Sequence, residues 1–103
     1  MKHNLETQTA LRRMVAVLAA ERQALAGLDL EAVMACSLEK QGLCAGLEQV
    51  GASELDDECL SLLESAQQMN EVNRQIRNLS AANIASRIEA IRGSATLYSV
   101  KRA

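Results

Sequence analysis

The sequence lacks proline, tryptophan and phenylalanine, and Tyr98 is its only aromatic residue. Strands are usually rich in valine, isoleucine, threonine and aromatic residues. This chain is instead rich in alanine, leucine, glutamate, glutamine and arginine, which favour helices. Because no proline interrupts a helix, the 103 residues predict an all-α fold, with residues 1–103 forming a single helical domain.

Residues for catalysis or metal binding are equally scarce. His3 is the only histidine, and Cys36, Cys44 and Cys59 are odd in number and form no Cys-x-x-Cys pair. This spacing fits neither a zinc site nor a disulfide framework, so we expect the cysteines to be small buried hydrophobes in a reducing cytosol. No glycine-rich phosphate loop and no nucleophile–base pair is present, so the sequence predicts no enzyme, no catalytic residues and no cofactor.

Long apolar runs are also missing. No stretch approaches the ~20 residues that a membrane helix needs, and the first residues do not resemble a signal peptide. We therefore expect a cytoplasmic protein without membrane insertion.

The net charge of −2 hides a strong asymmetry along the chain. Residues 1–28 carry +2, residues 29–65 carry −8 and residues 66–103 carry +4. This distribution fits either a polarised, solvated surface or two separate electrostatic docking faces. The acidic block argues against nucleic acid as a partner, because it would repel phosphates.

Two short breaks divide the chain into helices. In "AGLDLEAV" (26–33), Gly27 can end a helix and Asp29 can cap the next one. In "VGASELDD" (50–57), Gly51 can stop a helix, and Ser53 with Asp56 resembles a capping box. These signals predict helices over approximately 4–26, 30–49 and 54–97, packed as an antiparallel bundle or hairpin. One long helix over 5–50, continuous through Gly27, is the alternative.

The third helix carries the strongest pattern, a heptad repeat typical of coiled-coil packing. Its two series are Leu55, Leu62, Met69, Ile76 and Asn83, and Cys59, Ala66, Asn73 and Ser80. At ~1.5 Å per residue this helix is about 65 Å long, longer than the other two could cover. A polar residue at a core position fixes register at a cost in stability, so this pattern predicts that Asn73→Leu stabilises the fold. Lys40 is expected to snorkel at the edge of the second helix.

Several segments resemble the FlgN family of flagellar export chaperones. "LESAQQMNEVNRQI" resembles the central Asn-x-x-Asn motif of the family, through Asn70 and Asn73. The terminal "SATLYSVKRA" resembles the family's Tyr-Gly-x-x-Gly segment, although Ser99 replaces the first glycine. The residues that match the family's N-terminal pattern are Glu21, Leu25, Asp29, Glu31, Lys40, Leu43 and Leu47.

The resemblance implies a cytoplasmic chaperone of the flagellar type III export system. Such chaperones bind hook–filament junction (hook-associated) proteins and deliver them to the export apparatus, without ATP and without chemistry. Binding would be helix-in-groove, with an amphipathic client segment on the apolar face of the third helix and arginines beside it. The alternative is a structural coiled-coil module that forms a homodimer through the same helix and has no client. The candidate partner-binding residues are Asn70, Asn73, Ile76, Leu79, Ile84, Ile88, Ile91, Leu97 and Tyr98.

Overall fold

The fold is all-α, as the composition predicts. The computed structural model describes the backbone of residues 2–102 and the side chains of residues 5–94, except residue 52. Within that part of the chain it has three α-helices, α1 (Lys2–Ala26), α2 (Leu30–Leu47) and α3 (Asp57–Arg102), one 3₁₀ turn, η1 (Ala52–Glu54), and no strand. The predicted bundle of three helices with one long C-terminal helix is therefore confirmed.

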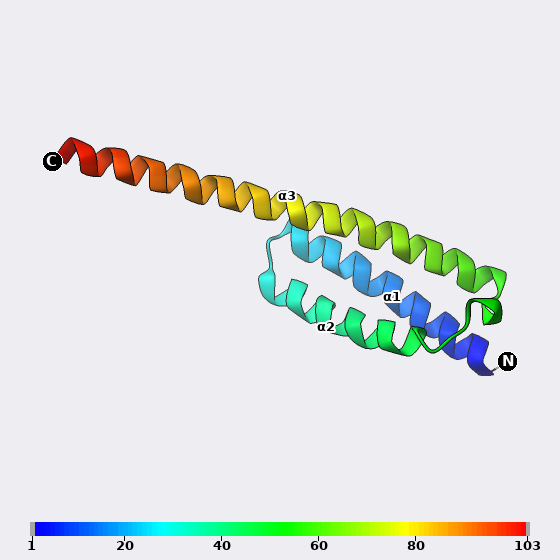
Figure 1. Cartoon of the computed structure of the whole chain (residues 1–103). Coiled ribbons are helices and arrows are strands. Elements are labelled where there is room, and N and C mark those ends of the chain that lie inside the picture. The colour runs from blue at the N-terminus through cyan, green and yellow to red at the C-terminus, as the bar shows by residue number, and fades with distance from the viewer. Residues whose placement is uncertain (1, 103) are drawn as a thin grey trace.

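The central helix of the bundle is α1. Its first half packs at the end where α3 begins, so α1 and α3 run in the same direction while α2 returns antiparallel to both (Figure 1). Both α2 and α3 pack extensively on α1, but they barely touch each other. The molecule measures 75 × 21 × 20 Å, and α3 sets the long dimension.

The turn between α1 and α2 excludes one continuous helix through Gly27. The Leu28 amide donates to Leu25 O over 3.2 Å and the Asp29 amide donates to Ala24 O over 2.9 Å, which is the Schellman pattern. Leu28 occupies the left-handed position of this motif, with φ of 54°. Asp29 then caps α2, as predicted, because its Oδ1 accepts from the Ala32 amide over 3.1 Å.

The connection to α3 differs from the sequence prediction. Helix α2 ends at Leu47, before Gly51 is reached, and Ser53 lies in η1. The N-cap of α3 is Asp56, whose Oδ1 accepts from the Cys59 amide over 2.8 Å. The predicted start at residue 54 is therefore too early and the Ser53–Asp56 capping box is wrong, because a 3₁₀ turn takes up the residues before Asp56.

The buried core lies between α1 and α3. Leu11 and Leu18 are 1% exposed, Cys59 is 0% exposed, and Met14 and Ala66 are also buried. Helix α2 contributes no buried residue at all. It rests on α1 through half-buried side chains, so it is the most weakly packed of the three helices.

Beyond the end of α1, α3 has no neighbour. Every residue from 81 to 94 is exposed, whereas Ser80 is still half-buried. We call residues 81–102 the overhang. Its 22 residues are helical, which makes it about 33 Å long.

Candidate binding surfaces

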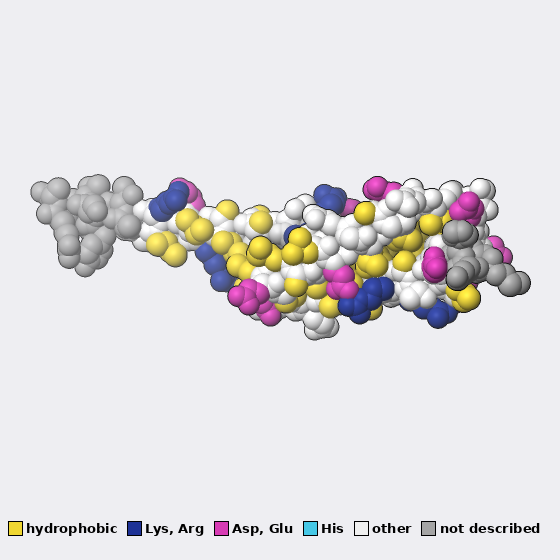
Figure 2. Space-filling view, turned by 90° about the horizontal axis from the view of Figure 1, so that it is seen from below, with side chains coloured by type: hydrophobic (Ala, Val, Ile, Leu, Met, Phe, Trp, Pro, Cys, Tyr) yellow, Lys and Arg dark blue, Asp and Glu magenta, His cyan; other side chains and the backbone are white. Residues whose placement is uncertain are grey.

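The overhang carries a ladder of exposed aliphatic side chains. Ile84, Ile88 and Ile91 are 46%, 45% and 69% exposed, and Leu79 just before the overhang is 71% exposed. Figure 2 shows hydrophobic side chains along this part of α3, with basic side chains beside them. An apolar strip of this kind, bordered by polar groups, is typical of an interaction site.

The isoleucines lie close to the direction of the seam by which α3 packs on α1, because the 18 residues from Asn73 to Ile91 make five full turns of a straight helix. That seam runs through Cys59, Ala66, Asn73 and Ser80, and seven-residue steps extend it to Arg87 and Ser94. The isoleucines belong to a second stripe, in which residues alternate four and three positions apart. The second stripe is Leu63, Gln67, Asn70, Arg74, Arg77, Ala81, Ile84, Ile88 and Ile91.

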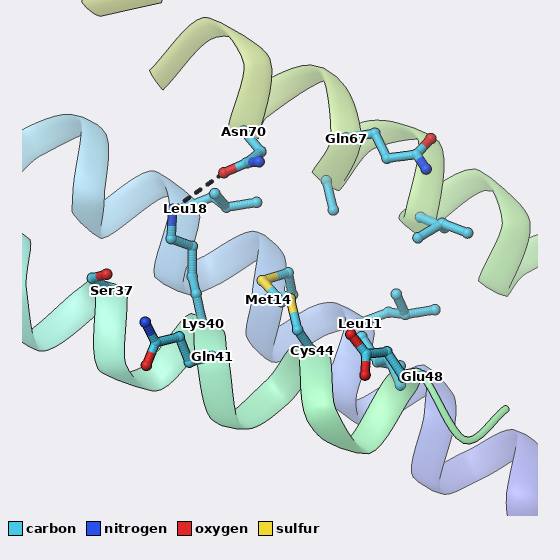
Figure 3. A pocket seen from close by; sticks show the side chains of 13 residues that line it. Leu11, Met14, Leu18, Ser37, Lys40, Gln41, Cys44, Glu48, Gln67 and Asn70 are labelled. Carbon is cyan, nitrogen blue, oxygen red and sulfur yellow. Dashed lines mark hydrogen bonds between the residues drawn. The ribbon is translucent and has the colours of Figure 1, made fainter. Parts of the chain in front are cut away.

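The N-terminal part of the second stripe lines a groove. This groove lies between α2 and α3 because the two helices barely touch, and it has a volume of about 550 Å³. Leu11, Met14 and Leu18 of α1 form its floor (Figure 3). Cys44 and Leu47 line the α2 side, and Leu63, Ala66 and Gln67 line the α3 side. The groove is therefore mostly apolar and presents the flank of each of its three helices.

One end of the groove is closed by a polar bridge. Lys40 Nζ of α2 donates to Asn70 Oδ1 of α3 over 3.1 Å, across the top of Leu18 (Figure 3). The same Nζ lies 2.9 Å from Oε2 of Glu21, which is completely buried on α1. Lys40 is thus an ion-pair partner of a buried carboxylate, and the expectation that it only snorkels is wrong.

Asn73 and Arg77 complete this polar cluster from α3. Asn73 Nδ2 donates to Glu21 Oε1 over 3.0 Å and to Leu18 O over 2.9 Å, and Arg77 Nη1 lies 3.5 Å from Glu21 Oε2. A buried carboxylate is tolerable only when charges and hydrogen bonds surround it. Glu21 therefore needs side chains from both neighbouring helices, so the cluster ties the three helices together in one register.

The structure separates the candidate partner-binding residues into different groups. Asn73 is 0% exposed and faces α1, so it has a packing role. Asn70 reaches across to α2 and lies at the groove. Ile76 is half-buried, whereas the aliphatic residues of the ladder are exposed. The side chains of Leu97 and Tyr98 lie outside the described residues.

The cysteines differ from one another. Cys59 is buried, as expected, but Cys36 is half-buried and Cys44 is exposed in the wall of the groove. Burial raises the pKa of the Cys59 thiol, as does a side-chain hydrogen bond with Asp56. Burial, followed by the charge of Glu21, raises the pKa of Cys36. Both shifts favour the protonated thiol at neutral pH.

Two further kinds of feature were sought in the described part of the chain, a metal-binding group and a membrane-spanning helix. Among those residues, no three His, Cys, Asp or Glu side chains gather in a group that could hold a metal ion. The helices described there are also too short or too polar to cross a bilayer.

Comparisons with known proteins identify no relative of this chain. No protein-family model matches the sequence, no curated protein matches it, and no solved structure matches the fold.

Proposed function

We propose that this protein is a cytoplasmic export chaperone of the flagellar type III system. It would bind hook-associated proteins and deliver them to the export apparatus. The family resemblance around Asn70, Asn73 and Tyr98 supplies the identity of the system. The observation that carries the binding mode is the ladder of Ile84, Ile88 and Ile91 on a helix that has no neighbour.

The overhang suits a helical client segment. An amphipathic helix presents aliphatic side chains at spacings of three and four residues, and the ladder offers the same spacings in return. Arg87 and Arg92 flank the isoleucines, so acidic residues at the edges of the client's apolar face would complement them. Burial of the aliphatic side chains supplies the affinity, and the charges improve specificity and the rate of association.

Co-purification with a hook-associated protein tests this function. Ile88→Asp places a charge in the apolar contact and should abolish co-purification. Leu60→Asp is the matched control, because Leu60 is also 45% exposed on α3 but lies outside both the ladder and the groove lining. Circular dichroism melts should show that both variants fold. If folded Ile88→Asp co-purifies as well as the wild-type chain, the overhang is not the client surface.

The end of α3 has its own test. Tyr98→Ala should leave the fold and client capture unchanged but reduce delivery, measured as secretion of the client. Unchanged secretion would remove Tyr98 from the proposed docking role and leave the client surface in place.

A further inference from the structure

We infer that two copies of this chain form an antiparallel dimer in which the overhang of each copy lies in the groove of the other. This inference concerns the chain alone and does not depend on the identity of a client. Four observations carry it: the continuity of the second stripe, the matching lengths of ladder and groove, the charge of the two halves of α3, and the inability of one chain to fill its own groove.

The second stripe joins both contact surfaces when the two α3 helices coil around each other, because seven-residue steps drift by about 20° per heptad on a straight helix. Leu63 and Asn70 line the groove, and Ile84 and Ile91 follow them at whole multiples of seven residues. Two helices that pack along such a repeat bring like-facing stripes together. In such a coiled pair, the residues of the second stripe that line the groove meet the isoleucines of the partner's overhang.

The lengths of the two surfaces agree. Leu63 and Asn70 are seven residues apart, and Ile84 and Ile91 are also seven residues apart. Each segment therefore covers about 10 Å of helix. The pairing that sets Ile91 against Leu63 of the partner centres the two-fold axis on Arg77. It also sets Ile84 against Asn70, so the overhang passes over the Lys40–Asn70 bridge to enter the groove.

The charges of α3 favour this antiparallel arrangement. Residues 57–76 carry four acidic groups and one basic group, or −3, and residues 77–102 carry five basic groups and one acidic group, or +4. An antiparallel pair sets the basic half of each α3 against the acidic half of the other, whereas a parallel pair would set like charges together. At the axis itself, each Arg77 has the carboxylate of Glu21 of its own chain at 3.5 Å.

The overhang cannot fill the groove of its own chain. Helix α3 is unbroken from Asp57 to Arg102, so the overhang points away from the bundle (Figure 1). A second copy, rotated by 180°, places its overhang beside the first bundle and receives the first overhang in return. Each end of the dimer then becomes a four-helix bundle, and the contact is isologous and closed.

Dimer formation would hide the ladder that the proposed function assigns to the client. Client and second copy would then compete for the same isoleucines. Because the groove belongs to the dimer alone, substitutions there separate the two roles.

Sedimentation of the purified chain, from low to high micromolar concentration, tests the dimer. We expect a monomer–dimer equilibrium that Ile88→Asp and Leu63→Glu each weaken about a hundredfold. A charge in an apolar contact costs at least about tenfold in affinity, and the change occurs twice in a two-fold dimer. Leu60→Asp should leave the equilibrium unchanged. A wild-type chain that stays monomeric at all these concentrations overturns the inference.

Disulfide trapping tests the register, and it avoids variants that fail to fold. In a chain with Cys36→Ser and Cys44→Ser, the pair Leu63→Cys and Ile91→Cys should form covalent dimers on oxidation, whereas either substitution alone should not. Cys59 stays in place because it is buried. A covalent dimer of the Ile91→Cys chain without Leu63→Cys indicates that the two overhangs pair with each other, and contradicts the docking in the groove.

Client capture distinguishes the two proposals. Leu63→Glu should lose the dimer and keep client binding, whereas Ile88→Asp should lose both. A dimer that behaves as described, with no client bound by any variant, refutes the proposed function and leaves the dimer intact.

Discussion

Replacing Asn73 should destabilise the protein strongly, which is the reverse of what the heptad pattern alone predicts. The substitution Asn73→Leu removes the Nδ2 donor that reaches Glu21 Oε1 at 3.0 Å and Leu18 O at 2.9 Å. A hydrogen bond to a charged group contributes about 1.5–3 kcal/mol, and a neutral one about 1 kcal/mol. Because Glu21 is completely buried, water cannot replace the lost donor. We expect a loss of about 2–4 kcal/mol of unfolding free energy.

Urea and thermal melts followed by far-ultraviolet circular dichroism measure this effect. A loss of this size lowers the melting temperature by roughly 10–20 °C in a domain of this length. Asn70→Ala is the control, because Asn70 is exposed and its removal leaves Lys40 paired with Glu21. Its cost should stay below about 1 kcal/mol. An Asn73→Leu chain as stable as the wild type would refute the role assigned to the cluster.

A double-mutant cycle isolates the coupling between Asn73 and Glu21. When Glu21→Leu is added to Asn73→Leu, the buried carboxylate that needed the amide is gone. Replacement of a buried polar group together with its partner by apolar residues is often close to neutral. The double variant should therefore be clearly more stable than the sum of the single effects predicts, by more than about 1 kcal/mol. Strict additivity would show that the two side chains do not depend on each other.

Three further changes have defined outcomes. Leu28→Gly should raise the unfolding free energy by roughly 0.5–1 kcal/mol in a urea melt, because glycine adopts the positive φ of 54° without the clash of a leucine Cβ; a loss of stability would show that the Leu28 side chain packs usefully. The hydrogen bond from the Cys59 amide holds the pKa of Asp56 below its usual value, so its stabilisation is complete above the unfolded-state pKa of about 3.9 and is lost as the pH falls through the lower folded-state value. The melting temperature of the wild-type chain should therefore fall towards, or below, that of Asp56→Asn in acid, and a constant difference would contradict this. In dilute solution, iodoacetamide should alkylate the exposed Cys44 before the buried Cys59, which peptide mass mapping would detect; equal rates would mean that the seam opens readily.

Helix composition and capping were readable from the sequence, but the contacts between helices were not. The absence of proline and the scarcity of aromatic residues predicted the all-α fold, and Asp29 marked the start of α2 correctly. The start of α3 was missed because Ser53 and Asp56 both carry capping side chains. Only the tertiary structure shows that Ser53 is taken up by a 3₁₀ turn.

The polar cluster was missed although each of its members left a signal. Glu21 lies seven residues after Met14, in the apolar stripe of α1, and Lys40 and Asn73 interrupt the stripes of α2 and α3. Each helix thus has one polar residue where its core face should be apolar. When each helix is considered alone, such a residue is interpreted as lying at the edge of the apolar face or as fixing the register of the packed helices. Only the pairing of the three helices shows that the exceptions meet at one point, with Nζ of Lys40 2.9 Å from the Glu21 carboxylate.

A change of heptad position along α3 explains why its apolar pattern looks irregular. Up to Ser80 the buried residues of α3 follow the seam that α1 covers, and the second stripe is polar at Asn70, Arg74 and Arg77. After Ser80 the seam turns polar and the second stripe turns to isoleucine, at the point where α1 ends. A helix that was merely solvated beyond α1 would have no need of aliphatic residues on either face. The aliphatic ladder of the overhang therefore favours the proposal that a second helix covers it.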